Sequence, residues 1–397
     1  MPEPDPFFNE PMPPQPIINA VGYATRVGGS CPHPEVLRAM QSAQERYFEI
    51  DDLLAHASCV IARRTGAEAG IVTCGASAAL TLGAAAILAG DDVARMEALP
   101  EVSGLPRHTF LYPVPGRYDY DHPVRASGAR LRPFPFDAPE LEERLRAALT
   151  TEVAGVVYVW KHGDDGATIR RIAAICREAG VPFLLDAAMA LPPAENLREL
   201  IRLGPDLVAL SGGKHLGGPQ NSGLLFGRAA LVRSAWLQMV DLDVRSGSWS
   251  LGAWLEAGHL PRPPRHGLGR GFKVGKDTIL GCVAALERYP LRDFAAERTR
   301  WHSLCAAMAG ALSGLSRFHV EYLRENGTGQ YPVVRLTAPD ADAMKWLKKS
   351  LKSQPPKIIL AEDDHHEAVA YLYPMCLSDA EANLLVERLT TLLTSQR

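Results

Sequence analysis

Three stretches of the sequence place chemically capable groups directly after short apolar runs. Gly75-Ala76-Ser77 follows the first run and opens a helical pattern. Backbone N–H groups at such a helix start favour an anion such as a phosphate. Asp186 follows the second run, and a carboxylate at the end of a buried strand is costly unless it has a partner. Lys214 follows the third run behind Ser211-Gly212-Gly213, which makes it a candidate amine nucleophile.

Each of these features has a plainer interpretation when it is taken alone. The small residues can form a tight strand-to-helix turn, Asp186 can cap the next helix, and a lone lysine is usually solvated. An anion cup, a carboxylate and a lysine that meet at one sheet edge are, however, the set that holds pyridoxal 5'-phosphate. The cup takes the phosphate, Asp186 protonates the pyridine nitrogen, and Lys214 forms the Schiff base. The three stretches together therefore predict a pyridoxal-phosphate site.

Strands alternate with helices in the part of the chain that carries these groups. Apolar runs bounded by turn residues predict strands at 70–74, Val153–Trp160, Val181–Leu185, Leu207–Leu210 and Gly223–Phe226. Helical spacing predicts helices at Pro34–Tyr47, Asp51–Thr65, Ser77–Leu88, Ala167–Ala179, Asn196–Leu203 and Lys276–Tyr289. This alternation indicates an α/β fold with a mostly parallel sheet, whose ligands bind outside the carboxyl ends of the strands.

The chain is predicted to have three parts. Residues 1–33 form an N-terminal arm, which is proline-rich and extended over Met1–Pro16. Residues 34–290 form the large cofactor-binding domain. Residues 291–397 form a smaller α+β C-terminal domain that ends in a helix at Ser378–Ser395.

Composition limits the classes of function. The 397 residues are 47% hydrophobic and 22% charged, which is ordinary for a globular protein. A net charge of −3 argues against a dedicated nucleic-acid binder, which usually carries a basic excess. No uncharged stretch reaches the roughly 20 apolar residues that cross a bilayer. The seven cysteines have no CxxC or metal-finger spacing, so we expect reduced thiols in a cytoplasm and no metal site.

Several motifs give the sequence a specific resemblance to a known family. It resembles the fold-type I pyridoxal-phosphate enzymes, and within them the group of selenocysteine synthase (L-seryl-tRNA seleniumtransferase) and D-glucosaminate-6-phosphate ammonia-lyase. The matching stretches are Ile18-Asn19-Ala20-Val21-Gly22, Gly28-Gly29-Ser30, Thr65-Gly66-Ala67-Glu68-Ala69, Thr73–Leu80, Asp186-Ala187-Ala188, Leu191-Pro192-Pro193, Ser211-Gly212-Gly213-Lys214, Gly218-Pro219-Gln220 and Lys273-Val274-Gly275-Lys276. The C-terminal part matches only in its general pattern.

The resemblance implies an aspartate-aminotransferase-like (fold type I) large domain and a role for each matching residue. Lys214 would be the Schiff-base lysine, and Asp186 would pair with the pyridine nitrogen. These two would be the catalytic residues. The cofactor would be bound by Gly75, Ala76, Ser77, Asp186, Ser211, Lys214 and Gln220.

Substrate binding is expected from basic residues. The stretch from Pro261 through Lys276 carries five Lys or Arg residues and no acidic one, so it could clamp a carboxylate or phosphate, or simply be a solvated basic loop. We assign Arg270 and Lys273 of this stretch, with Arg117, to substrate binding. Arg117 lies where the relatives carry a His-Arg pair, although glycine precedes it here. The group that stacks on the cofactor ring stays open: His108 is a candidate, and a surface-loop histidine is the alternative.

These residues can generate a carbanion at the substrate Cα, with Lys214 as the base. The sequence leaves the next step open. We expect an α,β-eliminating lyase of the dehydratase or ammonia-lyase type, acting on a small amino acid or amino-sugar acid. The alternatives are an amino-acid racemase or epimerase, a retro-aldol lyase, and a seleniumtransferase acting on aminoacyl-tRNA. The last is disfavoured because the match begins at Ile17–Asn19, with no tRNA-binding portion before it.

The expected partners follow from these assignments. They are a small amino-acid-like substrate and further copies of the chain, in a homodimer or larger homo-oligomer, because cofactor pockets of this fold type usually lie at a subunit interface. Neither a nucleic acid nor a membrane is expected as a partner.

Overall fold

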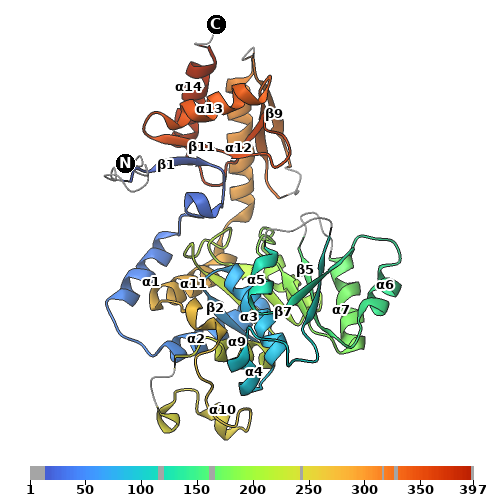
Figure 1. Ribbon diagram of the computed structural model, residues 1–397. Helices are drawn as coiled ribbons and strands as arrows, with labels where there is room; N and C mark the ends of the chain where they lie inside the picture. Colours follow the sequence, from blue (N-terminus) through green and yellow to red (C-terminus); the bar gives the residue numbers. More distant parts are fainter. Residues whose placement is uncertain are drawn as a thin grey trace, which may run out of the picture. The chain divides into compact units, whose positions relative to one another are not determined.

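The structure is a computed structural model that describes residues 14–114, 120–160, 166–241, 245–314, 317–325 and 330–394 (Figure 1). The chain forms two compact units. The large unit spans Gly28–Arg292, and the small unit combines the chain up to Val27 with the chain from Asp293 onward.

A seven-stranded sheet forms the centre of the large unit. Its order is β2 (Ala69–Thr73), β8 (Gly223–Gly227), β7 (Leu207–Ser211), β6 (Phe183–Asp186), β5 (Val153–Val159), β3 (Thr109–Pro113) and β4 (Arg130–Phe134). Strand β8 is antiparallel to both neighbours, and the other strand pairs are parallel. All residues of β6 and β8 are buried, as expected for strands covered on both faces. The predicted α/β fold with a mostly parallel sheet is confirmed.

Helices cover this sheet. They are α1 (Pro34–Gln44), α2 (Ile50–Thr65), α3 (Ala76–Ala89), α4 (Val93–Ala98), α5 (Asp121–Ala126), α6 (Leu141–Ala148), α7 (Ala167–Ala179), α8 (Asn196–Arg202), α9 (Ala229–Leu237), α10 (Ala253–Glu256) and α11 (Lys276–Arg288). Helix α3 crosses β5 to β8 and is buried nearly all round. Its small residues permit this close packing: Gly83 lies against Leu184 and Leu225, where a side chain would have little room.

Some predicted elements have different ends in the structure. The helix predicted at Pro34–Tyr47 ends at Gln44, and the strand predicted at Val181–Leu185 begins at Phe183. The second difference has a local cause. The Val181 N–H donates to the Cys176 carbonyl at the end of α7, and Pro182 has no N–H to give to a strand ladder.

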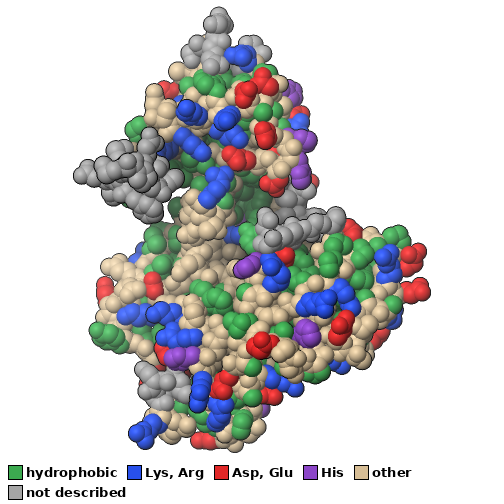
Figure 2. Space-filling view, in the orientation of Figure 1, with side chains coloured by type: hydrophobic (Ala, Val, Ile, Leu, Met, Phe, Trp, Pro, Cys, Tyr) green, Lys and Arg blue, Asp and Glu red, His purple; other side chains and the backbone are tan. Residues whose placement is uncertain are grey.

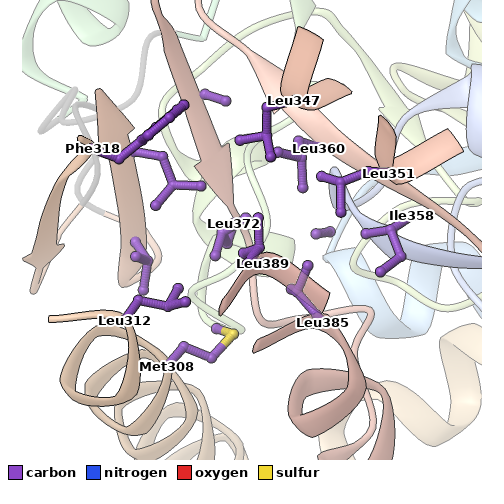
Figure 3. Close-up of a cluster of buried hydrophobic side chains, with 14 of the residues drawn as sticks. Met308, Leu312, Phe318, Leu347, Leu351, Ile358, Leu360, Leu372, Leu385 and Leu389 are labelled. Carbon is purple, nitrogen blue, oxygen red and sulfur yellow. The ribbon is translucent and has the colours of Figure 1, made fainter. Parts of the chain in front are cut away.

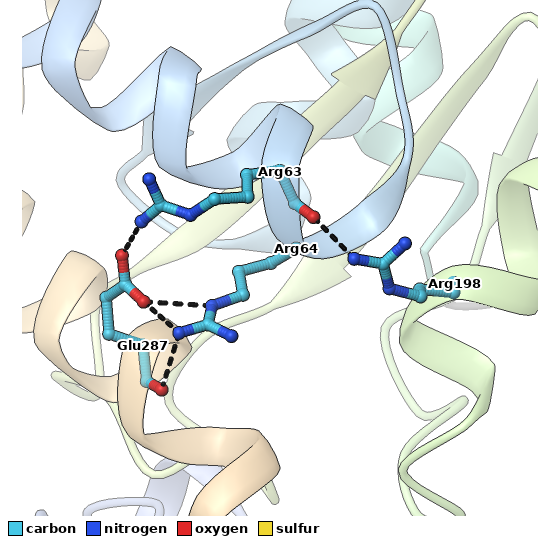
Figure 4. Close-up of polar contacts among 4 residues, drawn as sticks. All are labelled: Arg63, Arg64, Arg198 and Glu287. Carbon is cyan, nitrogen blue, oxygen red and sulfur yellow. Dashed lines mark hydrogen bonds and ion pairs between the residues drawn. The ribbon is translucent and has the colours of Figure 1, made fainter.

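An arginine cluster fastens three helices of the large unit together (Figure 4). Arg63 and Arg64 of α2 both pair with the Glu287 carboxylate of α11, and the Arg64 Nε–Glu287 Oε2 distance is 2.9 Å. Arg198 of α8 donates to the Arg63 carbonyl at 2.7 Å. The cluster therefore connects α2 and α8 to α11, the last α-helix before the large unit ends at Arg292.

The small unit has its own sheet and core. The sheet order is β1 (Ile17–Ala20), β11 (Lys357–Glu362), β12 (Val369–Leu372), β10 (Val333–Thr337) and β9 (His319–Leu323), and β1 is parallel to β11. Helices α12 (Phe294–Leu312), α13 (Ala341–Lys352) and α14 (Asp379–Thr394) supply apolar side chains such as Met308, Leu347 and Leu389, which pack with those of the strands (Figure 3).

The N-terminal segment differs from the predicted arm. Ile17–Ala20 is a strand, with Ile18 and Ala20 buried in the core of the small unit. The extended form predicted for Met1–Pro16 falls largely on residues 1–13, which lie outside the described residues.

Charged side chains are interspersed on the surface drawn in Figure 2, where acidic groups accompany the basic ones. Within the described ranges, no helix is long and apolar enough to cross a membrane.

Candidate active site

The strand register brings the predicted groups to one edge of the large sheet. Thr73 ends β2 and Ser211 ends β7, and both pair with Gly223 at the start of β8. Asp186 ends the neighbouring strand β6, where it pairs with Ala209 of β7. The carboxyl ends of β2, β6 and β7 therefore meet at the same edge, which is the ligand-binding edge of an open α/β sheet.

The loop after β2 forms an open cup at the start of α3. Gly75, which precedes the helix, has φ +110°, and its backbone conformation is one that favours glycine. No side chain caps the helix, so the first-turn N–H groups at Ala76 and Ser77 have no side-chain acceptor from the cap residue. A Cβ on Gly75 would meet nothing within 4 Å, whereas one on Gly223 would lie 2.6 Å from the Ala76 nitrogen. The cup thus packs tightly against β8 on one side and has room for an anion on the other.

Asp186 is a buried carboxylate, with 4% of its surface exposed. Its Oδ1 accepts a hydrogen bond from the Ala188 N–H at 3.1 Å. Burial raises the pKa of Asp186, and the Ala188 hydrogen bond and the Lys214 charge act in the opposite direction. A carboxylate held in this way benefits from any further cationic partner.

The charges of Lys214 and Asp186 interact with each other. Burial lowers the pKa of Lys214, and the Asp186 charge opposes this shift. Each group therefore perturbs the other within a buried site, a combination that is typical of functional sites. A lysine with a lowered pKa is more readily available as a free amine.

The loop that carries Lys214 is held closely on both sides. The Gly213 carbonyl accepts hydrogen bonds from the Ser30 N–H and the Ser30 Oγ, at 3.0 and 3.1 Å. A Cβ on Gly213 would lie 2.5 Å from the Gln220 Cα, so only glycine fits there. The Lys214 carbonyl accepts from the Gly217 N–H at 3.0 Å. These contacts give a role to Ser30, for which the sequence motif alone indicated none.

These residues fit pyridoxal phosphate. The open cup at α3 suits a phosphate, the buried Asp186 suits a protonated ring nitrogen, and the Lys214 amine suits the aldehyde carbon. Gln220 is exposed, and its Cγ would lie 3.1 Å from a Cβ at Gly29. Its predicted contact with the cofactor stays a prediction.

Arg270 and Lys273 lie at a different place on the large unit. They line a cavity of about 490 Å³, together with residues that include Glu49, Trp236 and Asp241. Of the described residues that line it, none is Lys214, Asp186 or part of the cup. The cavity that these two cations line within one copy of the chain therefore does not include the lysine.

Acidic residues from elsewhere in the chain partly neutralise the predicted basic loop. Glu97 of α4 pairs with Arg262 at 2.6 Å, and this hydrogen bond lowers the pKa of Glu97 to about 2. Asp241, just after α9, pairs with Arg270 and, at 2.9 Å, with His266. Among the described contacts, Lys273 has no such acidic partner.

His108 is not placed to stack on the cofactor ring. It immediately precedes β3, and its Nδ1 contacts the Leu105 carbonyl at 3.1 Å. Strand β3 is parallel to β5, so His108 lies at the amino edge of the sheet, opposite the edge that carries Asp186. Arg117, the other sequence candidate near this part of the chain, lies outside the described residues.

No group of three or more His, Cys, Asp or Glu side chains in the described part of the chain could hold a metal ion.

Comparisons of the sequence identify relatives along nearly the whole chain. No family model matches it. It is 27% identical to a 5'-C-glycyluridine monooxygenase-decarboxylase of a Streptomyces species, covering 95% of this chain and 90% of the relative. It is 26% identical to a D-glucosaminate-6-phosphate ammonia lyase of Salmonella typhimurium, covering 94% of each. An L-seryl-tRNA(Sec) selenium transferase of Solidesulfovibrio magneticus is 23% identical, over 93% of this chain and 80% of the relative.

Solved structures share the fold. A D-glucosaminate-6-phosphate ammonia-lyase superposes with a TM-score of 0.75 and 24% identity, covering 96% of each chain. A ureidoglycine-glyoxylate aminotransferase from Bacillus subtilis gives a TM-score of 0.57 at 14% identity, covering 98% of this chain and 95% of the other. Together with the sequence relatives, these likenesses confirm the predicted fold, family resemblance and cofactor. The chain is a pyridoxal-phosphate enzyme of fold type I, related to D-glucosaminate-6-phosphate ammonia lyase and to the L-seryl-tRNA(Sec) selenium transferases.

Proposed function

We propose that the protein is an α,β-eliminating lyase of the ammonia-lyase type, acting on a small amino acid or amino-sugar acid that carries a further anionic group. The observation that carries this proposal is the partly buried Lys214 beside the buried Asp186 at the sheet edge, with the open start of α3 on the same edge. Relatedness to an ammonia lyase along 94% of the chain supports the reaction class.

Lys214 and Asp186 divide the proton chemistry between them. When bound, pyridoxal phosphate acts as an electron sink for the bond that breaks at the substrate Cα. Asp186 holds a proton on the ring nitrogen and so keeps the sink effective. Lys214, whose pKa is lowered by burial, accepts the Cα proton as general base. Loss of the β-hydroxyl as water, followed by hydrolysis, then gives a keto acid and ammonia.

The anionic group of the substrate would be held by Arg270 and Lys273, with Arg117 as a third candidate. Lys273 is exposed at the cavity, and Arg270 is oriented by its pairing with Asp241. A guanidinium and an ammonium suit a phosphate or carboxylate through charge-assisted hydrogen bonds. The phosphate of D-glucosaminate 6-phosphate, the substrate named for one relative, is a group of this kind.

These cations would reach the lysine of a second copy in a homodimer or larger homo-oligomer. Two observations support a shared site. The cavity of Arg270 and Lys273 is separate from Lys214 within one copy. Its lining includes Ile50, and the adjoining Tyr47 and Phe48 are 99% and 40% exposed, leaving an apolar surface that a second copy would cover.

Mixing two impaired variants tests the shared site, with the substrate held well below KM so that Lys273→Ala alone is only weakly active. Lys214→Ala and Lys273→Ala chains, unfolded and refolded together, should regain activity, because one of the two mixed sites is intact. Lys352→Ala, which removes an exposed lysine at the end of α13 in the small unit, is the matched control and should remain active alone. A fully active monomer in sedimentation, or no recovery on mixing, would contradict the proposal.

The seven free cysteines further support a reducing compartment such as the cytoplasm.

A substrate panel tests the reaction. The purified holoenzyme is incubated with D-glucosaminate 6-phosphate and with D- and L-β-hydroxy amino acids, with Lys214→Ala as control. We expect stoichiometric keto acid and ammonia. Inverted configuration without ammonia would indicate a racemase, and an aldehyde with glycine would indicate retro-aldol cleavage. Oxygen uptake with release of carbon dioxide would place the chain with its monooxygenase-decarboxylase relative. Each of these three results would overturn the lyase proposal.

A further inference from the structure

Two buried side chains and a partly buried arginine form a trio that begins at the residue after Lys214. His215, the next residue in the chain, is 2% exposed, and its Nδ1 lies 2.8 Å from the hydroxyl of Tyr289, which is fully buried. Arg292 donates to the His215 main-chain carbonyl, and its Nη2 lies 3.4 Å from the His215 Nε2. The Arg292 guanidinium also lies over the Tyr289 ring, 5.3 Å from its centroid.

The polarity of these contacts is set by their chemistry. A guanidinium can only donate, so the His215 Nε2 accepts from Arg292 and the ring proton lies on Nδ1. The Nδ1–H then donates to the Tyr289 hydroxyl. Burial, with the Arg292 charge, lowers the pKa of His215 well below its usual value, so the ring is neutral. Both ring nitrogens and the main-chain carbonyl of His215 thus contact residues that follow α11.

The trio contacts the main chain next to Lys214 and does not act on the pKa of the lysine. The pKa of Lys214 responds to burial and to Asp186, and His215 carries no charge. Arg292 instead holds the carbonyl one residue beyond Lys214, while Ser30 holds the carbonyl one residue before it. The Lys214 main chain is therefore clamped on both sides by residues far from it in sequence.

We propose that Arg292, His215 and Tyr289 are positioning residues that hold the Lys214 main chain where its amine can bond the cofactor. The proposal rests on the proposed role of Lys214. A displacement of about 1 Å is enough to cost such a site about 100-fold, so a clamp on the adjoining carbonyl is functionally significant.

The test compares two forms of the cofactor. Pyridoxal phosphate uses the lysine bond, the phosphate cup and Asp186, whereas pyridoxamine phosphate uses only the last two. Arg292→Met should weaken pyridoxal phosphate binding about tenfold or more, the usual effect of losing a charge-assisted hydrogen bond, and leave pyridoxamine phosphate binding unchanged. Arg292→Lys should restore part of the loss. Tyr289→Phe, which removes one oxygen, should act in the same direction and more weakly.

Two matched controls are available in the chain. Arg288→Met removes an arginine one turn earlier that pairs with Glu35 on the surface. Tyr322→Phe removes an equivalent bond in the small unit, where the Tyr322 hydroxyl lies 2.6 Å from the His302 Nδ1. Neither should change the ratio of the two affinities. Equal weakening of both cofactor forms by Arg292→Met and Tyr289→Phe, or no weakening, would overturn the positioning role.

Borohydride reduction separates this proposal from the one on which it rests. If the reduced cofactor is found on Lys214 but the affinity ratio is unchanged in the variants, only the positioning role fails. If it is found on another lysine, both proposals fail. Amide hydrogen exchange over 215–218 in the cofactor-free protein gives a second readout, which should be faster in Arg292→Met and unchanged in Arg288→Met.

Discussion

Replacing Gly213 by alanine should displace Lys214 without removing any group that contacts the cofactor. A Cβ at this position would lie 2.5 Å from the Gln220 Cα and 2.7 Å from the Gln220 carbonyl carbon. Carbon atoms normally approach to about 3.5–4.0 Å, so the loop must open by about 1 Å. The contacts are with backbone, which cannot rotate away as a side chain could.

The magnitude follows from this overlap. Overpacking of this kind costs about 1–3 kcal/mol of unfolding free energy, and a shift of the lysine by about 1 Å costs about 100-fold in turnover. Thermal unfolding and the visible absorbance of bound cofactor measure the two effects. Gly104→Ala, where a Cβ would meet nothing within 4 Å, is the control and should behave as wild type. A Gly213→Ala protein with wild-type Tm and wild-type cofactor occupancy would refute the close packing of this loop.

Three further predictions concern charged groups. Asp186→Asn should bind the cofactor and lose about 10²–10³ in kcat, because an amide cannot hold a proton on the ring nitrogen; wild-type turnover would show that Asp186 has no such role. Lys273→Ala should raise KM about tenfold or more for a phosphorylated substrate. An unchanged KM would show that Lys273 is a solvated surface residue with no role in substrate binding. Glu97→Gln should lower Tm slightly at pH 7, since the pKa of Glu97 is lowered to about 2 by Arg262. The stabilisation is present above the usual pKa of 4.5 and is lost as pH falls through about 2, and it is under about 1 kcal/mol because the pair is partly exposed. A Tm difference that grows toward pH 2 would contradict this assignment.

Local patterns were enough to predict the edge of the sheet that carries the site. Asp186 and Lys214 each follow an apolar strand, and parallel strands bring their carboxyl ends together. The same rule excludes His108, because this residue precedes its strand. These inferences depend only on neighbours in sequence and on strand direction.

Pairings between distant residues could not be predicted in the same way. His215 contacts Tyr289 and Arg292, which are 74 and 77 positions away from it in the sequence. Glu97 neutralises Arg262 from 165 positions away, so a loop that contains no acidic residue is nevertheless partly neutral. Strand β1 joins β11 from the opposite end of the chain. A single sequence shows the groups in each case but not which of them meet.

The central claim is that Lys214 bonds the cofactor, and borohydride reduction tests it most directly. The purified protein should be yellow, and reduction should fix the cofactor covalently on one peptide, which mass spectrometry identifies. The account predicts that this peptide contains Lys214 and that Lys214→Ala takes up no covalent label. Label on Lys161 or Lys273, with Lys214 unmodified, would contradict the site assignment.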